Sequence, residues 1–586
     1  MYAFSGIIVR QMNKKIVRRR LSEASPILAV DLHPLLARIY STRQVSSSVE
    51  LENSLDKLLP VDLLSGIEQA VDLLIHALKT DERILIVGDF DADGATSCAL
   101  AVRALRMLGV ADVDYLVPNR FEFGYGLTKE IVAVAAQGKP DLIITVDNGI
   151  SSVEGVKAAR ENDIKVLVTD HHLPGKELPN ANAIVNPNQE GDTFPSKNLA
   201  GVGVIFYVML ALRTRLRALD WFDELGIEEP NLAQLLDLVA LGTVADVVTL
   251  DQNNRILVEQ GLRRIRAGQC CVGIKALLEV ADRRPERVVA SDFGFAVAPR
   301  LNAAGRLNDM SQGIACLLSN DPARARERAK SLDSLNKERR DIEQGMKTQA
   351  ISILEALHLD ERLNELPMGL CLFDEGWHQG VIGILASRIK EHMFRPVIIF
   401  APSDEKELKG SARSIPGLHI RDVLDAVAAH NPGLLTRFGG HAMAAGMTLK
   451  REHYTKFSKV FDDEVRRQLS ADDLQQVVHS DGQLTADDHN LEIAEMLRSA
   501  GPWGQGFPEP VFDGRFDVID QKIVGDNHLK MVLKIPDSNR HIDAIAFNTK
   551  VDSELSQVDV AYRLDVNEFH GKRSAQLIIQ HIEPSS

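Results

Sequence analysis

The sequence predicts an α/β protein of several domains: a parallel sheet flanked by helices, a long connecting helix, a second α/β domain and a C-terminal β-barrel module. Three patterns support this prediction. Short apolar runs alternate with helical stretches over residues 83–187, a long polar stretch covers 322–357, and apolar and polar residues alternate after residue 472. A continuously apolar run suits a strand buried on both faces, whereas strict alternation suits a strand with one face in solvent.

Length and composition limit the possible classes of protein. The chain has 586 residues, more than one domain of roughly 100 to 200 residues would need. With 45% hydrophobic and 25% charged residues, the composition is that of globular proteins and excludes disorder throughout. The formal charge is −15. Because a local basic groove can exist on an acidic protein, this sum does not decide the ligand.

Location is predicted from apolar runs and cysteines. No apolar run approaches the ~20 residues of a membrane-spanning helix, so we expect no membrane association. The N-terminus is apolar first and basic afterwards, the reverse of a secretory signal. Five cysteines without a CxxC pair form neither a disulfide framework nor a zinc-ligand pattern. These features predict a cytoplasmic protein.

The first domain is predicted from its alternating elements. We expect strands at the runs RILIV, VDYLV, LIITV, VLVT and AIVN, and helices at 95–108, 152–161, 199–219 and 231–248. Such alternation of strands and helices indicates βαβ units and a parallel sheet. In parallel sheets of this kind, ligands bind at the carboxyl ends of the strands.

The remaining elements complete the domain plan. The stretch 322–357 is predicted to be a long helix; its basic residues are either a solvated face or a ridge that faces nucleic acid, and the pattern leaves both open. Strand-like runs at 368–373 and 396–400 indicate the second α/β domain, and runs at 529–535, 558–566 and 574–582 indicate a small all-β module. The predicted boundaries are 1–36 for an N-terminal extension and 37–320 for the first α/β domain. The connecting helix is expected at 321–365, the second α/β domain at 366–465 and the β-barrel module at 466–586.

A cluster of carboxylates follows the first predicted strand. The segment IVGDFDADGATS places Asp89, Asp91 and Asp93 at alternate positions, with Gly94 allowing a tight turn into the next helix. Carboxylates so close together raise one another's pKa unless a cation compensates, and hard divalent cations prefer oxygen ligands. Taken alone, such a loop is as compatible with an ion-free acidic turn as with a metal site.

Similar side chains follow two further strands. Asp147 comes directly after LIITV, and Asp170, His171 and His172 come after VLVT. Imidazole with several carboxylates and no thiolate favours manganese or magnesium over structural zinc. Asp246, at a helix-to-loop junction, could supply one more carboxylate. The sequence therefore predicts a metal site at the carboxyl edge of the sheet.

The segments VGDFDADG, TVDNG and TDHH, in this order, resemble the DHH phosphoesterase superfamily. Four more segments resemble the RecJ family of exonucleases, with its DHH-associated domain and OB-like C-terminal module: PRLNAAGR, GWHQGVIGILASR, GSARS and FGGHAMAAG. The resemblance covers nearly the whole chain from about residue 37. It implies a metal-dependent exonuclease that degrades single-stranded DNA in the 5′ to 3′ direction by two-metal phosphodiester hydrolysis. The implied setting is recombination and DNA repair, with the site between the DHH and DHH-associated domains.

The resemblance also implies the residues that hold two Mn²⁺ or Mg²⁺ ions. The expected ligands are Asp91, Asp93, Asp147, His171 and Asp246, with Asp147 as the bridge because it follows the central strand. Whether Asp89 is a direct ligand stays open, because many relatives have a histidine just before the first carboxylate pair, where this chain has valine and glycine. Asp170 is either a ligand or the partner that orients His171. We expect His172 near the scissile phosphate.

Further motif residues are expected to contact DNA. Arg300, Asn302, Arg306 and His441 match family motifs that contact phosphate, although Arg306 is equally compatible with a structural ion pair. Gly439 and Gly440 would let the backbone approach an anion closely. Arg120, Ser411 and Arg413 match the family's 5′-end pocket, where guanidinium suits bidentate phosphate contact.

Substrate and partners follow from the same resemblance. It implies single-stranded DNA as substrate, a single-stranded DNA-binding protein and a helicase as partners, and a monomer. Most phenylalanines of the C-terminal module are expected in its core rather than stacked on bases. Two alternatives are a phosphodiesterase for short oligoribonucleotides or cyclic dinucleotides, and a replication scaffold without ligands. The segment 472–586 argues against the first, and the five candidate ligands argue against the second.

Overall fold

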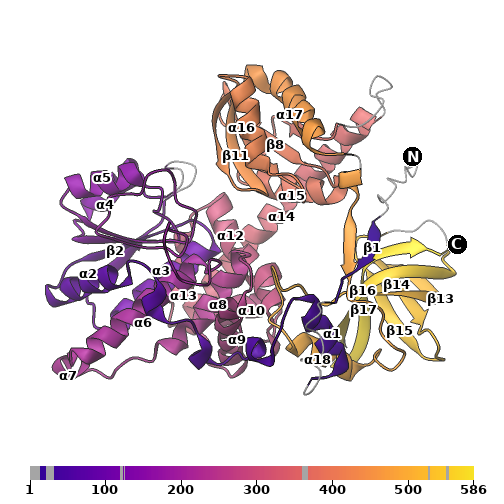
Figure 1. The fold of residues 1–586 in the computed structure, drawn as a ribbon, viewed down its shortest axis with the longest axis horizontal. Coiled ribbons are helices and arrows are strands. Elements are labelled where there is room, and N and C mark those ends of the chain that lie inside the picture. Colours follow the sequence, from indigo (N-terminus) through magenta and orange to yellow (C-terminus); the bar gives the residue numbers. More distant parts are fainter. Residues whose placement is uncertain are drawn as a thin grey trace. The chain divides into compact units, whose positions relative to one another are not determined.

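The structure is a computed structural model, and Figure 1 shows its fold. It describes residues 14–21, 32–118, 123, 126–358, 367–470, 472–525, 528–549, 554–569 and 571–585. The chain divides into two compact units. One comprises Met1–Val17 with Lys337–His479, and the other comprises Arg18–Asn336 with Ser480–Ser586. Each unit is described by itself.

The larger unit contains the predicted parallel sheet. Its five strands have the order β3-β2-β4-β5-β6, and all neighbouring pairs are parallel. The strands are β2 (Ile84–Gly88), β3 (Val113–Leu116), β4 (Leu142–Val146), β5 (Lys165–Thr169) and β6 (Ala183–Val185). Every residue of β4 is buried, as expected for a central strand covered on both faces. The predicted fold class is confirmed.

Helices cover both faces of this sheet (Figure 1). Helices α2 (Ile67–Lys79), α3 (Ala92–Met107) and α6 (Gly201–Ala218) share one apolar core with it, and α4 (Lys129–Gln137) and α5 (Val153–Glu161) share another. The helical part continues with α7 (Trp221–Leu225), α8 (Leu236–Ala245), α9 (Gln252–Arg266), α10 (Val272–Val280), α11 (Ala290–Asp292), a π-helical segment (Phe293–Val297), α12 (Ala298–Leu307) and α13 (Ser311–Leu318). Over the described ranges, we find no helix both long and apolar enough to cross a membrane.

The predicted long helix is α14 (Pro322–His358), and the division between the two units falls inside it. The smaller unit then contains a mixed sheet of order β10-β11-β9-β8-β7. Its strands are β7 (Leu370–Phe373), β8 (Val397–Pro402), β9 (Glu407–Arg413), β10 (Leu435–Gly440) and β11 (Ala444–Lys450). Its helices are α15 (Ile382–Met393), α16 (Ile420–His430) and α17 (Tyr454–Gln468).

The C-terminal module is a closed barrel of order β13-β14-β15-β17-β16. Its strands are β13 (Phe512–Val524), β14 (His528–Lys534), β15 (His541–Ala546), β16 (Gln557–Phe569) and β17 (Lys572–Pro584). The alternation predicted this correctly: Leu529, Met531 and Leu533 are buried, whereas Lys530 points outward and pairs with Asp543 at 3.2 Å.

The expectation of an all-β module was incomplete. Helix α18 (Leu491–Ser499) packs its apolar side against the barrel core, as does α1 (Pro34–Thr42) from the N-terminal part of the chain. Phe507, Phe512 and Phe516 are buried as expected, and Phe547 is exposed. Strand β1 (Lys15–Arg18) pairs with β12 (Val477–Ser480) outside the barrel.

A buried ion pair joins α1 to the segment that leads into the barrel. The side chains of Arg43 and Asp481 are 1% and 0% exposed. Asp481 accepts hydrogen bonds from Arg43 Nη2 at 2.9 Å, Thr42 Oγ1 at 2.9 Å and the amide of Val511 at 3.0 Å. This carboxylate therefore holds together parts of the chain that are distant in sequence.

We expect Asp481→Ala to lower the free energy of unfolding by about 3–5 kcal/mol, because Arg43 would be left as a buried charge without its partner. Urea denaturation followed by circular dichroism measures this. The exposed pair of Arg515 and Asp559 provides the control, since Asp559→Ala should cost less than about 1 kcal/mol. Equal costs for the two variants would contradict the importance of the buried pair.

Candidate metal centre

The predicted donor residues meet at the carboxyl edge of the parallel sheet. Among the described residues, three groups of side chains have ligand atoms within 4.8 Å of one another. The groups are Asp89, Asp91 and Asp147; Asp93, His171 and Asp246; and Asp147, His171 and His172. Asp147 and His171 each belong to two groups, so the donor atoms form one continuous cluster.

The loop after β2 is a tight turn into α3. Asp91 is the N-cap of this helix, and its Oδ1 accepts a hydrogen bond from the amide of Gly94 at 3.0 Å. Asp89 Oδ1 accepts from the amide of Phe90 at 2.8 Å. A Cβ on Gly94 would lie 2.4 Å from the carbonyl oxygen of Asp89, so only glycine allows this close turn. The alternating aspartates are thus fixed by backbone geometry.

Asp93 points from the first turn of α3 to the start of α6. Its carboxylate accepts hydrogen bonds from the amides of Gly201 at 2.7 Å and Val202 at 3.0 Å. Amides at a helix N-terminus favour a negative charge. Burial and then the neighbouring charge of Asp91 nevertheless raise the pKa of Asp93 to about 7.

The loop after β4 places Asp147 in a left-handed backbone conformation with φ of 61°. Asn148 donates from Nδ2 to the carbonyl oxygens of Val87 at 3.0 Å and Val146 at 2.9 Å, which ties the ends of β2 and β4 together. Burial, followed by the charges of Asp93 and Asp91, raises the pKa of Asp147 well above its usual value.

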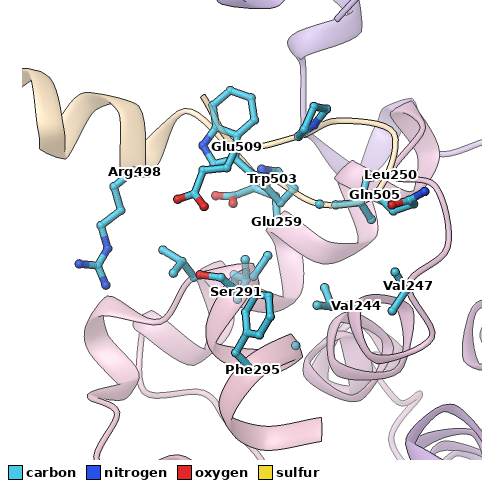
Figure 2. A pocket seen from close by; sticks show the side chains of 18 of the residues that line it. Val244, Val247, Leu250, Glu259, Ser291, Phe295, Arg498, Trp503, Gln505 and Glu509 are labelled. Atoms are coloured by element: carbon cyan, nitrogen blue, oxygen red, sulfur yellow. The ribbon is translucent and has the colours of Figure 1, made fainter. Parts of the chain in front are cut away.

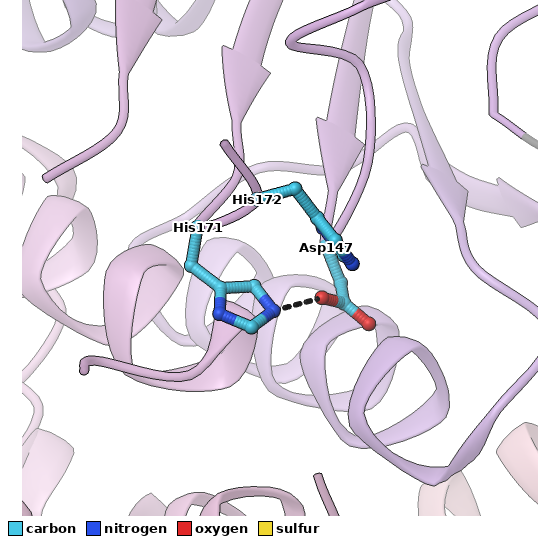
Figure 3. Close-up of side chains that lie close together, drawn as sticks. All are labelled: Asp147, His171 and His172. Carbon is cyan, nitrogen blue, oxygen red and sulfur yellow. Dashed lines mark ion pairs between the residues drawn. The ribbon is translucent and has the colours of Figure 1, made fainter. Parts of the chain in front are cut away.

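His171 connects the central carboxylate with the one from α8. Figure 3 shows its imidazole facing Asp147, with Nε2 of His171 lying 3.1 Å from Oδ1 of Asp147. The same nitrogen lies 3.5 Å from Oδ2 of Asp246, the C-cap residue of α8. Burial and then the charge of Asp93 raise the pKa of Asp246 well above its ordinary range.

Asp170 holds a different imidazole from the one predicted. Its Oδ1 lies 2.7 Å from Nδ1 of His172, and it also accepts from the amides of His171 at 2.7 Å and His172 at 3.1 Å. Burial opposes protonation of His172, but the hydrogen bond and charge of Asp170 outweigh it and raise the pKa of His172 to about 9. The ring oriented by Asp170 is therefore that of His172.

The donor set fits hard divalent cations. Burial, and after it the charge of neighbouring carboxylates, raises the pKa values of Asp93, Asp147 and Asp246. A cation among these carboxylates would favour their ionised forms. Carboxylate oxygens together with imidazole nitrogen suit Mn²⁺ or Mg²⁺.

Comparisons with known proteins agree with this geometry. Residues 83–243 match the model of the DHH family N-terminal domain, 367–467 that of the DHHA1 domain and 480–581 that of the RecJ OB domain. The single-stranded-DNA-specific exonuclease RecJ of Dickeya dadantii is 56% identical over 98% of this chain and 100% of its own length. The chain belongs to the RecJ family. The Escherichia coli RecJ exonuclease is 54% identical over 97% of this chain and 99% of its own.

Solved RecJ structures carry the expected metals. RecJ from Thermus thermophilus in complex with Mn²⁺ has a TM-score of 0.79 and 29% identity, covering 98% of this chain and 80% of that one. The Mg²⁺ complex from the same organism has a TM-score of 0.74 and 27% identity, covering 98% and 79%. The RecJ family thus includes proteins that bind the cations that this donor set fits.

The predicted phosphate contacts on α12 have structural partners. Arg300 donates from Nε to Asp333 at 2.9 Å and from Nη1 to the carbonyl oxygen of Ala296 at 2.6 Å. Asn302 accepts from the amide of Ala92 at 2.8 Å, at the start of α3. Arg306 lies one turn further along α12. Asn302 therefore supports the aspartate loop directly, and contact of these residues with phosphate stays a prediction.

The predicted 5′-end residues lie in the smaller unit, apart from Arg120, which is outside the described residues. Arg413 donates to Ser387 Oγ and to Ser411 Oγ, each at 3.2 Å. Burial lowers the pKa of Arg413. Gly383, near the start of α15, is close to Arg413 and Ser411, since a Cβ there would lie 3.1 Å from Arg413 Nη2 and 3.2 Å from Ser411 Oγ. A guanidinium, hydroxyl groups and a helix start thus share one small region.

The FGGH motif also lies in the smaller unit, at the end of β10. A Cβ on Gly439 would meet no atom within 4 Å, so the backbone is open to approach there. Gly440 has φ of 146°, and the amide of His441 donates to the carbonyl oxygen of Ala444 at 2.8 Å in the turn between β10 and β11. Anion contact by these three residues stays a prediction.

Two glycines that support the carboxylates were missed by sequence reasoning. A Cβ on Gly201 would lie 2.6 Å from Oδ1 of Asp147, and one on Gly242 would lie 2.7 Å from Oδ1 of Asp93. Neither residue carries ligand chemistry, so no donor motif includes them. The only signal was the run of small residues around each glycine, in AGVG and LGT.

We expect Gly201→Ala to weaken Mn²⁺ binding about tenfold or more, because its methyl group would displace the carboxylate of Asp147. Isothermal titration calorimetry measures the affinity. Gly345→Ala in α14 is the matched control, since a Cβ there would meet no atom within 4 Å. If both variants bind Mn²⁺ like the wild type, close packing of Gly201 on Asp147 has no role in the metal centre.

Proposed function

We propose that this chain is a metal-dependent exonuclease that degrades single-stranded DNA from the 5′ end toward the 3′ end. The observation that carries the proposal is the cluster in which Asp147 and His171 each join two groups of donor atoms. Relatives named single-stranded-DNA-specific exonuclease, at 56% and 54% identity over nearly the full chain, support the substrate class. The direction of degradation is inferred from the family resemblance.

In this proposal, two Mn²⁺ or Mg²⁺ ions are held by Asp91, Asp93, Asp147, His171 and Asp246, with Asp89 as a further candidate. When bound, such ions supply an activated water and stabilise the leaving oxygen of a phosphodiester. The chain itself fixes the donors before substrate arrives, because strand ends, helix caps and glycine contacts determine their positions. Such preorganisation lowers the cost of reaching the transition state.

His172 is proposed to face the scissile phosphate. Nδ1 of His172 lies 2.7 Å from Oδ1 of Asp170, so Asp170 fixes the orientation of this ring, and the charge of Asp170 favours the protonated imidazole that would attract a phosphate oxygen. Arg300, Asn302, Arg306 and His441 are proposed to contribute phosphate contacts. Oδ1 of Asn302 accepts from the amide of Ala92, and a contact with a phosphate oxygen would come from Nδ2, the donor of the carboxamide.

End recognition is proposed to reside at Arg413 and Ser411, together with Arg120, Gly439 and Gly440. Support comes from the arrangement of Arg413, two serine hydroxyls and the start of α15. A guanidinium with neutral donors beside it suits a terminal phosphate.

The match of residues 480–581 to a RecJ OB domain favours a long strand over a short oligonucleotide or a cyclic dinucleotide. The predicted domain boundaries, the monomeric state and the partners, a single-stranded DNA-binding protein and a helicase, stay predictions from family resemblance. So do the roles in recombination and DNA repair. The cytoplasmic location rests on the sequence pattern of the cysteines.

A time course with 5′-labelled and 3′-labelled single-stranded DNA tests the proposal. With Mn²⁺ present, we expect the 5′ label to be released early as mononucleotide while the 3′ label stays in shortening strands. Asp147→Ala should reduce hydrolysis at least about 1,000-fold, because it removes the carboxylate shared by two donor groups. Early release of the 3′ label, or turnover by Asp147→Ala at the wild-type rate, would contradict the proposal.

Arg413→Ala should reduce the preference for 5′-phosphorylated over 5′-hydroxyl strands by about tenfold, since a charge-assisted contact to the terminal phosphate is lost. The ratio of kcat/KM for the two substrates measures this preference. Arg421→Ala removes an exposed arginine from α16 in the same unit and serves as control. An unchanged ratio in Arg413→Ala would remove Arg413 from end recognition.

A further inference from the structure

Two asparagines that have no part in the proposed mechanism hold the histidine loop, residues 170–172, which follows β5. His171 and His172 lie outside helices and strands. Buried backbone N–H and C=O groups need hydrogen-bond partners, and here regular secondary structure does not supply them. The groups that do supply them determine where the two imidazoles point (Figure 3).

Asp170 binds the N–H side of this loop. Its Oδ1 accepts from the backbone amides of His171 at 2.7 Å and His172 at 3.1 Å. Its Oδ2 accepts from the amide of Ile150 at 2.9 Å, in the loop that also carries Asp147. The residue is 1% exposed. One buried carboxylate therefore fixes both N–H groups relative to the loop after β4.

Asn186 and Asn188 bind the C=O side. Nδ2 of Asn186 donates to the carbonyl oxygen of His172 at 2.9 Å, and Nδ2 of Asn188 donates to that of His171 at 2.6 Å. Both asparagines follow the end of β6, the strand beside β5 in the sheet. Together with Asp170, they bond all four backbone N–H and C=O groups of the two histidines. Side chains thus do here what secondary structure does elsewhere.

The asparagines are themselves held in place. Asn186 is 0% exposed, and its Oδ1 accepts from the amide of Asn188 at 2.7 Å. Nδ2 of Asn188 also donates to the carbonyl oxygen of Lys197 at 3.2 Å. Nζ of Lys197 in turn donates to the carbonyl oxygens of Pro187 at 2.7 Å and Asp192 at 2.8 Å. Supporting side chains that are locked in this way can hold a functional residue in one geometry.

The segment that carries the asparagines continues to the other donor residues. It leads into α6, whose first amides bond to Asp93 and whose Gly201 lies against Asp147. Nε2 of His171 lies 3.1 Å from Oδ1 of Asp147. Metal–ligand distances stay within about 0.2 Å of their preferred values. A small displacement of the histidine loop would therefore be enough to weaken a metal contact.

A cavity of about 470 Å³ in the larger unit does not involve this loop. Figure 2 shows its walls, which include Val244 and Val247 from the end of α8 and Trp503 from the segment before the barrel. Among the described residues that line it, none belongs to the histidine loop or to residues 186–188. Substitution of the asparagines therefore changes the loop and leaves the walls of this cavity as they are.

We propose that Asn186 and Asn188 are positioning residues of the metal centre. They fix the C=O side of the histidine loop so that His171 reaches a bound cation and His172 reaches the scissile phosphate. This inference rests on the proposed function. Each asparagine bonds to one histidine, so Asn188 acts mainly on cation affinity and Asn186 acts mainly on turnover. Groups that orient the residues around a metal contribute about 10–100-fold in affinity or activity.

Titration with Mn²⁺ in the absence of DNA tests the role of Asn188. We expect Asn188→Ala and Asn188→Leu each to weaken Mn²⁺ binding about tenfold in isothermal titration calorimetry, because neither side chain can donate to the carbonyl oxygen of His171. Leucine keeps the branched shape of asparagine, so it separates the lost hydrogen bond from the lost volume. Wild-type affinity in either variant would overturn the proposal.

Asn490→Ala is the matched control. Nδ2 of Asn490 donates to the carbonyl oxygen of Asp487 at 2.7 Å and its Oδ1 accepts from the amide of Ile493 at 2.9 Å, the same pattern of bonds at the start of α18. This variant should have a lower thermal unfolding midpoint and an unchanged Kd for Mn²⁺. An equal loss of Mn²⁺ affinity in Asn490→Ala and Asn188→Ala would assign the effect to general destabilisation and overturn the proposal.

Turnover at saturating Mn²⁺ tests the role of Asn186. We expect Asn186→Ala to lower kcat on single-stranded DNA about tenfold or more with little change in KM, as for a contact that matters only in the transition state. Asn188→Ala should regain most of its kcat, since excess Mn²⁺ compensates for weaker binding. If the alanine variant does not fold, Asn186→Asp keeps the acceptor for the amide of Asn188 and removes only the donor. Wild-type kcat in a folded Asn186 variant would contradict the positioning role.

Failure of the proposed function would look different. A wild type that binds Mn²⁺ but hydrolyses no DNA would contradict the exonuclease assignment, while the Mn²⁺ titrations would still decide the role of Asn188. Hydrolysis by the wild type, with wild-type Mn²⁺ affinity and kcat in the variants of both asparagines, would overturn only the positioning role.

Discussion

The burial of several carboxylates close together is the constraint on which the metal centre depends. Asp93, Asp147 and Asp246 come from three different elements, and each has a raised pKa because it is buried near the others. The sheet fixes Asp147, α3 fixes Asp93 and α8 fixes Asp246. Burial near the other carboxylates therefore opposes the ionisation of each group, and a bound cation would favour the ionised forms and stabilise the folded chain.

Backbone groups and small residues carry out much of this positioning. Amides at the start of α6 receive Asp93, an amide in the following turn receives Asp91, and Gly201 and Gly242 leave room for the carboxylates beside them. Backbone dipoles of this kind are fixed by the helices that contain them and need no reorganisation when a charged ligand arrives. The metal centre is therefore a property of the packed elements as much as of the acidic residues.

The sequence was sufficient to predict the parallel sheet, the long helix α14 and the barrel strands, because each of them follows from a local pattern of apolar and polar residues. It was also sufficient to locate the donor residues, since the carboxyl ends of parallel strands meet at one edge. It could not show that Asp170 holds His172 rather than His171, because both histidines follow Asp170 directly and the sequence does not say which ring faces it. Nor could it show α18 against the barrel or the glycines under the carboxylates, because these arise from contacts between distant segments.

The packing of α1 on the barrel has a consequence for biosynthesis. Leu35 and Ile39 belong to the same apolar core as strands that begin at Phe512. At about 5–20 residues per second, a ribosome needs on the order of half a minute to a minute and a half between making the two. During that interval the barrel that covers the apolar side of α1 is not yet made. The nascent chain therefore exposes an aggregation-prone apolar segment, of the kind that chaperones bind.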